Sequence, residues 1–284
     1  MLKKMLGLAP KLELNGAYSP SRVALKLATV ERTNFENLAY DAYSGARNKV
    51  LVIFTEQSTM KMKNGKRFST GNHPVEALLP MLHLENAGFE FVIATPTGKP
   101  VAFEMWAFPK QDSHVQLIYN QLKSKFDRPR NLAEVVRESL SDDPMYAAVF
   151  VPGGHGAMLG IPEDENVGRV LNWAHEKGVF TITLCHGPGS LLATVSDKGD
   201  FPYAGYRMAI FPDSVDRMTP MIGYLPGRMP RGLSETLKGL GAVMVNKKGD
   251  DTVWRDRELI TGASPLASNE LGKLAVRTLL AELN

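Results

Sequence analysis

The chain has 284 residues, 44% of them apolar and 22% charged, a composition that excludes a disordered or fibrous protein. The 33 basic and 30 acidic residues leave a net charge of +3 and are interspersed along most of the chain, so the charge pattern does not indicate sequence-specific nucleic-acid binding. No segment approaches the roughly 20 apolar residues of a membrane span. The lone cysteine cannot form an internal disulfide, so we expect a cytoplasmic protein.

Hydrophobic runs rich in β-branched residues alternate along the chain with segments of helical periodicity. The predicted strands are KVLVIF (49–54), FEFVIAT (89–95), YAAVFV (146–151), VFTITL (179–184) and AVMVN (242–246). The predicted helices are HPVEALLPMLHLENAG (73–88), NVGRVLNWAHEKG (166–178) and PLASNELGKLAVRTLLAELN (265–284). This alternation predicts an α/β fold with a mainly parallel sheet covered by helices on both faces.

Two regions do not follow this alternation. Residues 1–47 contain no convincing strand, and residues 97–145 form a polar, aromatic-bearing insertion where a simple α/β unit needs only a short loop. We expect residues 1–47 to be an N-terminal extension and linker that packs with a small satellite domain. Residues 48–284 would form the α/β domain, with 97–145 as an inserted lid or satellite segment.

The only cysteine, Cys185, directly follows the predicted strand 179–184 and precedes His186, Gly187 and Pro188. Ligands of open α/β sheets bind at the carboxyl ends of the strands. A sharp turn into a helix would expose the sulfur near a helix N-terminus, where the pKa of a thiol falls and the reactive thiolate is favoured. The alternative is an inert buried thiol, since free cysteine is commonly buried.

A glycine-rich loop follows another predicted strand, in YAAVFVPGGHGAMLG. Gly153 and Gly154 lie directly after Pro152, and their backbone N–H groups could point into the same crevice as the thiol. Such amides suit the oxyanion that forms when a thiolate attacks a carbonyl. An ordinary glycine turn is the alternative interpretation.

Three further polar residues could complete a catalytic site around this thiol. Glu76 lies in the first turn of the helix predicted at 73–88, and burial would raise the pKa of its carboxyl toward the range of a proton carrier. His186 and Asp216 supply a possible base and its orienting partner. The alternatives are a glutamate that merely favours a helix N-terminus and a solvated histidine beside an unrelated aspartate.

Several segments together resemble one known family. They are KVLVIF, GKRFSTGNHPVEALLPMLHLENAGFEF, YAAVFVPGGHGAMLGIP, TLCHGP, FPDSVDRMTPMIGYLPG and LITGASPLASNELGKLA. Residues 48–284 resemble the bacterial heat-shock chaperones also described as glutathione-independent glyoxalase III and protein deglycase. These belong to the superfamily of the parkinsonism-associated deglycase and class I glutamine-amidotransferase-like domains. The first 45 or so residues match poorly.

The resemblance implies a flavodoxin-like three-layer sandwich with a small added domain, and a homodimer. It implies that Cys185 is the nucleophile and that His186 and Asp216 are the second and third members of the site. Glu76 would be the acidic partner of the thiol, while Gly154, next to Gly153, and the backbone of His186 would form the oxyanion site. A shift of the loop could exchange Asp216 for Asp213, three residues earlier.

The family's metal site, two histidines and a glutamate, is incomplete in this sequence. The matching positions are Glu85, Glu90 and Leu122. A leucine cannot bind a metal ion, and two carboxylates without an imidazole suit a hard cation better than zinc. We therefore expect no zinc site of this type and no cofactor, although His83 and His114 could supply a different metal site.

The resemblance implies conversion of methylglyoxal to lactate through a Cys185 hemithioacetal, without glutathione. The same chemistry on glyoxal adducts of proteins or nucleotides would be deglycation. The expected partners are small dicarbonyl substrates and glycated or unfolded proteins, with no membrane.

Two other functions remain open from the sequence. A cysteine peptidase or amidohydrolase would use the same thiol and oxyanion site. A chaperone without a catalytic role would need an exposed apolar surface, for which Phe103, Met105, Trp106 and Phe108 are candidates. Packing of these residues within the inserted segment is the alternative.

Overall fold

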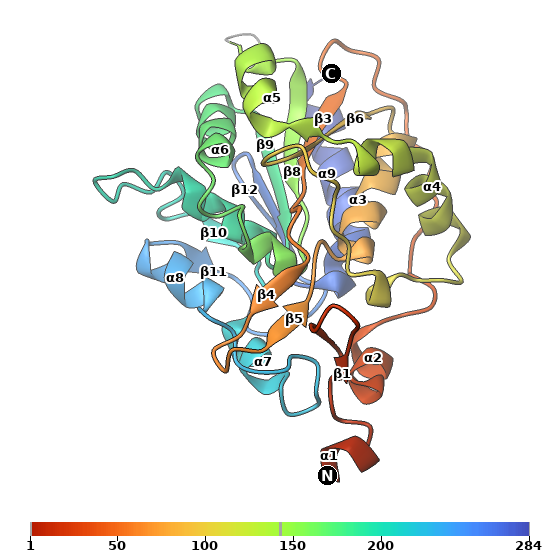
Figure 1. The fold of residues 1–284 in the computed structure, drawn as a ribbon. Coiled ribbons are helices and arrows are strands. Elements are labelled where there is room, and N and C mark those ends of the chain that lie inside the picture. The colour runs from red at the N-terminus through yellow and green to blue at the C-terminus, as the bar shows by residue number, and fades with distance from the viewer. Residues whose placement is uncertain (1, 142–143, 284) are drawn as a thin grey trace.

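The computed structural model describes residues 2–141 and 144–283, and its centre is a sheet with the strand order β12-β13-β9-β8-β3-β6-β7 (Figure 1). Its strands are β3 (Lys49–Ile53), β6 (Glu90–Thr95), β7 (Arg130–Asn131), β8 (Tyr146–Val151), β9 (Phe180–Leu184), β12 (Val253–Asp256) and β13 (Leu259–Gly262). All neighbours pair in parallel except β12, which pairs antiparallel with β13. The predicted α/β fold with a mainly parallel sheet is confirmed.

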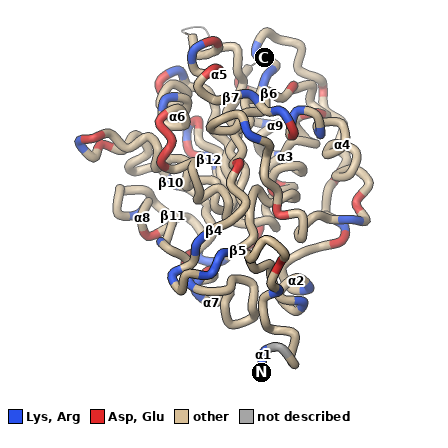
Figure 2. The backbone as a smooth tube through the Cα atoms, viewed as in Figure 1, with Lys and Arg blue, Asp and Glu red and all other residues tan. Residues whose placement is uncertain are grey.

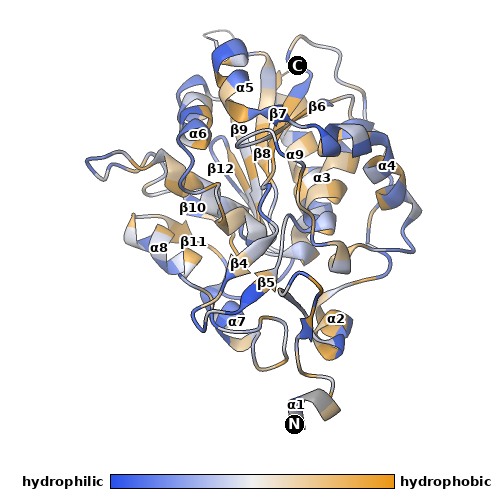
Figure 3. Cartoon of the chain, viewed as in Figure 1, coloured by the Kyte–Doolittle hydropathy of each residue, from blue (hydrophilic) through white to orange (hydrophobic). Residues whose placement is uncertain are grey.

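Helices cover both faces of this sheet. The covering helices are α3 (Pro74–Asn86), α4 (Ser113–Asp127) and α9 (Ser268–Leu283) on one face, and α5 (Leu132–Ser139) and α6 (Glu165–Lys177) on the other. Successive residues of β3 point to opposite faces, so that Val50 and Val52 pack in the core beneath α3 and α9, while Leu51 and Ile53 pack beneath α5 and α6. The hydropathy colouring shows apolar residues along the central strands, and charged residues lie mostly on the outer helices and loops (Figures 2 and 3). The chain thus forms a three-layer sandwich.

Local sequence signals determine where the main helices begin and end. Pro74 occupies the first turn of α3, where the missing N–H costs little. The Asp164 side chain accepts hydrogen bonds from the first turn of α6, and Gly178 ends that helix in the left-handed conformation with φ 65°. The helices predicted from periodicity are therefore confirmed, apart from small differences at their ends.

One predicted strand is shorter than expected and lies outside the main sheet. Residues 242–246 contribute only β11 (Val243–Met244), which pairs with β10 (Arg207–Met208) in a separate two-stranded sheet. The position next to β9 in the main sheet is taken by β13, which the sequence analysis missed because this strand is only four residues long and ends in threonine and glycine. Val243 is 47% exposed, which is incompatible with a central strand.

The N-terminal region forms more regular structure than expected. It contains α1 (Leu2–Met5), β1 (Lys11–Leu12), β2 (Tyr18–Ser19) and α2 (Arg22–Ala28). The two short strands join β4 (Thr59–Lys61) and β5 (Arg67–Ser69) in a small sheet ordered β1-β2-β5-β4. The expectation of no strand in residues 1–47 was therefore wrong; these strands are too short to produce a hydrophobic pattern.

The polypeptide between α2 and β3 runs along the outside of the main helices. Thr33 hydrogen-bonds the carboxylate of Asp112 before α4, Tyr40 contacts His83 of α3, and Glu36 pairs with Lys273 of α9. In the segment 97–145, β7 is the edge strand of the main sheet and α4 packs on α3. Both irregular regions are thus joined to the sandwich by specific contacts.

The remaining elements lie near the carboxyl ends of the central strands. They are the 3-10 helices η1 (Met105–Ala107), η2 (His155–Met158), η3 (Gly187–Thr194) and η4 (Pro265–Ala267), with the short helices α7 (Asp213–Met218) and α8 (Leu233–Gly239). None of the helices in the described part of the chain has the length and apolar character needed to cross a membrane.

Candidate active site

Cys185 lies at the tight turn that follows β9. Its φ angle is 59°, in the left-handed region that residues with a Cβ atom rarely adopt. The backbone is held there from both sides, because the Cys185 N–H donates to the Gly262 carbonyl of β13 and its carbonyl accepts from the Phe211 N–H. The 3-10 helix η3 begins at Gly187, so the helix predicted to follow Cys185 is present as a 3-10 helix. A backbone strained in this way and fixed by its neighbours is typical of a functional site.

The side chain of the next residue, His186, turns back toward this sulfur. Its Nδ1 atom is 3.3 Å from Cys185 Sγ, and its Nε2 atom is 2.8 Å from Asp216 Oδ2. Because an ionised carboxylate only accepts hydrogen bonds, Nε2 carries a proton. In the neutral imidazole, Nδ1 is then the acceptor that faces the thiol. The arrangement can remove a proton from the Cys185 sulfur.

Asp216, and not Asp213, faces this imidazole. Asp216 lies in α7 and is 5% exposed. The carboxylate of Asp213 instead accepts from the backbone N–H groups of Leu233, Ser234 and Glu235 at the start of α8. The exchange between the two aspartates left open by the sequence therefore does not occur in this structure, because Asp213 acts as a helix cap.

Glu76, in the first turn of α3, lies close to the thiol. It is 1% exposed, and burial raises the pKa of its carboxyl well above the usual range, with the nearby carboxyl of Glu104 adding to the rise. Hydrogen bonds with the Cys185 side chain and with the Gly154 backbone partly oppose this increase in pKa. The carboxyl therefore keeps its proton to a higher pH than an exposed glutamate does.

The environment of the thiol differs from the one expected. The sequence analysis expected the turn to lower the pKa of Cys185, but burial raises it well above its usual value, and the charges of Glu76 and Asp216 add to the rise. Cys185 is only 3% exposed. Desolvation disfavours a thiolate more than the short helix favours it, so deprotonation depends on transfer of the proton to a neighbouring group.

The glycine loop after β8 lies against the same side chains. A Cβ atom on Gly153 would be 2.0 Å from Glu76 Oε2 and 2.9 Å from the Cβ of Cys185. Gly154 has φ 97°, and its backbone hydrogen-bonds the carboxyl of Glu76. The loop therefore needs glycine for close approach. An oxyanion at the Gly154 N–H would have to share this donor with Glu76.

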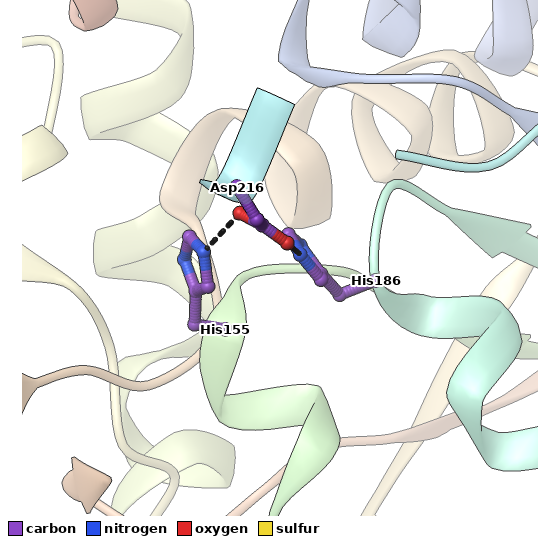
Figure 4. Close-up of side chains that lie close together, drawn as sticks. All are labelled: His155, His186 and Asp216. Carbon is purple, nitrogen blue, oxygen red and sulfur yellow. Dashed lines mark hydrogen bonds and ion pairs between the residues drawn. The ribbon is translucent and has the colours of Figure 1, made fainter. Parts of the chain in front are cut away.

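Two residues of the site were missed by the sequence analysis. His155, in η2, places Nε2 at 3.0 Å from Asp216 Oδ1 (Figure 4). Glu104 lies buried beside Glu76. Burial raises the pKa of Glu104 to about 7, against hydrogen bonds from the Thr70 hydroxyl and the His155 backbone. The PGGHG loop suggested backbone donors only, and no local pattern indicated that its histidine would contact Asp216 or that a residue of the inserted segment would lie beside Glu76.

Buried polar atoms without partners face this region. Within the described residues, His73 Nδ1, Glu76 Oε2 and Glu104 Oε2 have no hydrogen-bond partner. Burial lowers the pKa of His73 to about 3, so the imidazole is neutral at physiological pH. Unsatisfied polar atoms at low exposure are costly and are typical of a site that binds a polar ligand.

One group of side chains in the described part of the chain has the spacing of a metal site. The ligand atoms of His155, His186 and Asp216 lie within 4.8 Å of one another. Two imidazoles and a carboxylate suit zinc, but here the same atoms hydrogen-bond one another. The alternative site raised for His83 and His114 finds no support, because both ring nitrogens of His83 already contact Tyr40 and Asn269.

Similar proteins are known. The chain is 48% identical over 269 residues to the protein/nucleic acid deglycase HchA of Pseudomonas aeruginosa, covering 94% of this chain and 92% of that protein. The Staphylococcus aureus protein of the same name is 45% identical over 268 residues, with 94% and 92% covered.

Solved structures share the fold at lower identity. Glyoxalase III from Candida albicans superposes with a TM-score of 0.63 at 20% identity, covering 82% of this chain and 97% of that one. The Rapid Encystment Protein of Francisella tularensis has a TM-score of 0.69 at 19% identity, covering 82% and 99%. No family model matches the chain.

Proposed function

Because this chain belongs to the family of the protein/nucleic acid deglycase HchA, we propose that it is a cysteine-dependent glyoxalase III and deglycase. The observation that carries the proposal is the buried thiol of Cys185, which lies close to the proton-accepting nitrogen of His186 and to the carboxyl of Glu76. A thiol, a base and a proton carrier at one point are the groups that addition to an aldehyde and internal proton transfer require.

The first step is addition to the aldehyde carbon of methylglyoxal. His186 Nδ1 takes the thiol proton as the carbon–sulfur bond forms, and the protonated carboxyl of Glu76 gives its proton to the carbonyl oxygen, which gives a hemithioacetal and leaves Glu76 ionised. The neighbouring Asp216 stabilises the imidazolium that results, because its carboxylate contacts Nε2 at 2.8 Å. Transfer of the proton to His186 thus lets the thiol react although its pKa is raised.

The second step moves a proton between adjacent carbons. A carboxyl of Glu76 in its ionised form removes the proton from the former aldehyde carbon, giving an enediolate, and returns it to the neighbouring carbon. The hydroxyl proton of the former aldehyde carbon passes to the neighbouring oxygen, and the product is a thioester, which one water molecule hydrolyses to lactate and free Cys185. Because the pKa of Glu76 is raised, the carboxyl is a stronger base than an exposed glutamate once it is ionised.

The burial of the site favours small substrates. Cys185 is 3% exposed and Glu76 and His186 are each 1% exposed, so a free dicarbonyl reaches the sulfur more readily than a group attached to a folded protein. An adduct on a protein side chain or nucleotide would have to extend into the site. We therefore propose free methylglyoxal or glyoxal as the first substrates to test, with glycated amino, guanidino and thiol groups second.

The chaperone activity, the homodimer and the cytoplasmic location stay predictions. The inserted aromatic residues do not supply the exposed surface, because Phe103 and Phe108 pack against the core and Trp106 packs against Phe68 and Tyr224. Large exposed apolar side chains gather instead near the N-terminus, at Met5, Leu6, Leu12, Leu14 and Leu27. Light scattering of the purified protein tests the dimer.

The decisive experiment measures lactate formed from methylglyoxal without glutathione. We expect lactate from the wild type and none above background from Cys185→Ala or Glu76→Gln, with unchanged circular dichroism. If the wild type formed no lactate at millimolar methylglyoxal, the glyoxalase proposal would be overturned. If Cys185→Ala kept its activity, the cysteine mechanism would be overturned. Peptide hydrolysis by the wild type, lost in Cys185→Ala, would favour the peptidase.

A further inference from the structure

Asp216 is held by a second imidazole in addition to that of His186. His155 Nε2 lies 3.0 Å from Asp216 Oδ1, while His186 Nε2 lies 2.8 Å from Oδ2, so each carboxylate oxygen has its own donor (Figure 4). His155 is 4% exposed and Asp216 is 5% exposed. The resemblance to the family assigned no role to His155, and the mechanism above does not use it.

The position of His155 is set by contacts that are independent of His186. Its ring packs edge-on against Phe68 and at a tilt of 45° against Tyr224, in both cases with 5.7 Å between ring centroids. Its backbone hydrogen-bonds the buried carboxyl of Glu104. Because η2 follows β8 while His186 follows β9, the carboxylate in α7 is held between two different strand ends.

Both imidazoles keep Asp216 ionised. Burial alone raises the pKa of this carboxyl, but His186 and His155 outweigh burial and hold the pKa well below its usual value. An ionised carboxylate keeps the proton of His186 on Nε2 and leaves Nδ1 free to accept the thiol proton. Without His155, Oδ1 would be a buried acceptor without a donor, and the carboxylate could rotate or take up a proton.

We propose that His155 is a positioning residue: it holds Asp216 in the orientation that sets the tautomer of His186, and so controls the reactivity of the Cys185 thiol. The titratable groups that face His155 are Asp216, His186, Glu104 and His73, with Tyr224 packed on its ring. The effect of His155 on turnover rests on the proposed function, whereas its effect on the thiol does not.

The test uses alkylation of the thiol by iodoacetamide, followed by mass spectrometry from pH 6 to pH 10. Cys185 is the only cysteine, so each modified molecule reports this site. His155→Phe retains an aromatic ring without a hydrogen-bond donor. We expect it to react roughly tenfold more slowly than the wild type at pH 7, with its pH profile displaced to higher pH, because removal of an orienting partner commonly costs at least this factor.

His155→Gln is the matched control. The amide nitrogen of glutamine lies at about the position of imidazole Nε2, so this variant should recover most of the wild-type rate and pH profile. His155→Asn, whose amide is one methylene group shorter, should behave like His155→Phe. Thermal unfolding monitored by circular dichroism shows which variants fold. If the Phe variant does not fold, the comparison of the Gln and Asn variants is sufficient to test the proposal.

Each result decides the proposal. It is supported if, among the folded variants, Cys185 is alkylated at close to the wild-type rate where a hydrogen-bond donor lies near Asp216 Oδ1 and more slowly where that donor is missing. It is overturned if folded His155→Phe or His155→Asn matches the wild-type profile, or if His155→Gln loses as much reactivity as His155→Asn. Failure of the wild type to form lactate, with these alkylation differences intact, would overturn the proposed function but not the role of His155.

Discussion

The imidazole of His186 contacts the sulfur of the residue directly before it, with Nδ1 at 3.3 Å from Cys185 Sγ. Consecutive side chains in a strand point to opposite sides, so this contact needs the sharp turn at Cys185, where φ is 59°. The turn therefore has two effects. It places the thiol at the end of the sheet, and it brings the neighbouring base within reach of the thiol proton.

The two nearby aspartates should give opposite phenotypes. Asp216→Asn replaces a carboxylate that holds two imidazoles, so we expect lactate formation to fall by roughly 100-fold or more, as when an acid that orients a catalytic histidine is lost. Asp213→Ala removes the acceptor for the first turn of α8 and should lower the free energy of unfolding by about 1 kcal/mol with near wild-type activity. Equal loss of activity in both folded variants would contradict the assignment of Asp216.

The buried carboxyl of Glu104 should make stability depend on pH. Its folded-state pKa is raised from 4.5 to about 7, so the folded form binds the proton more tightly than the unfolded form. The contribution of the protonated Glu104 carboxyl to the free energy of unfolding is complete below pH 4.5 and is lost as the pH rises through 7. Glu104→Gln should match the wild type at pH 4 and exceed its unfolding free energy by up to about 3 kcal/mol at pH 8.

Urea unfolding at several pH values measures this difference. The pKa of Glu76 is also raised, in part by the carboxyl of Glu104, so Glu104→Gln lowers the Glu76 pKa as well and adds to the difference in the same direction. Glu176→Gln, at an exposed position of α6, is the control and should leave the pH dependence unchanged. A constant difference between Glu104→Gln and the wild type across this range would show that Glu104 does not titrate there.

A methyl group at Gly153 should damage the site selectively. Its Cβ would lie 2.0 Å from Glu76 Oε2 and 2.3 Å from the Leu184 carbonyl oxygen, so Glu76 or the turn must move. We expect Gly153→Ala to lose roughly 100-fold in lactate formation, because small displacements of reacting groups cost this much. Gly239→Ala in α8 meets no atom within 4 Å and should retain activity. Full activity of Gly153→Ala would contradict the close packing of Glu76 against the loop.

Removal of metal ions should not affect the reaction. The positions that the resemblance matches to the family's metal site are Glu85, Glu90 and Leu122, and every proposed step uses protein groups. Lactate formation is therefore expected to be the same before and after dialysis against EDTA. Added zinc should inhibit, because binding at His155, His186 and Asp216 would occupy Nε2 of the base. Loss of activity with EDTA that zinc restores would contradict this prediction.

Several features of the molecule followed from local sequence. The strands around 49–54, 146–151 and 179–184 are rich in apolar and β-branched residues, as a strand buried on both faces requires. The main helices followed from periodicity, Pro74 and Gly178. Together they indicated the sheet edge at which Cys185 and Glu76 lie. The short strand β13 was missed, because four residues contain too little pattern to distinguish a strand from a loop.

Only the tertiary structure determined which residues distant in sequence contact one another at the site. The sequence placed a thiol, a histidine, a glutamate and two aspartates near one sheet edge as candidates. The packing of α7 and α8 decided that Asp216 faces His186 while Asp213 caps a helix. Burial decided that the pKa of the Cys185 thiol is raised and not lowered, because desolvation depends on everything packed around the sulfur. A local pattern specifies backbone conformation and residue chemistry, whereas hydrogen-bond partners and solvent exclusion arise only when distant segments pack together.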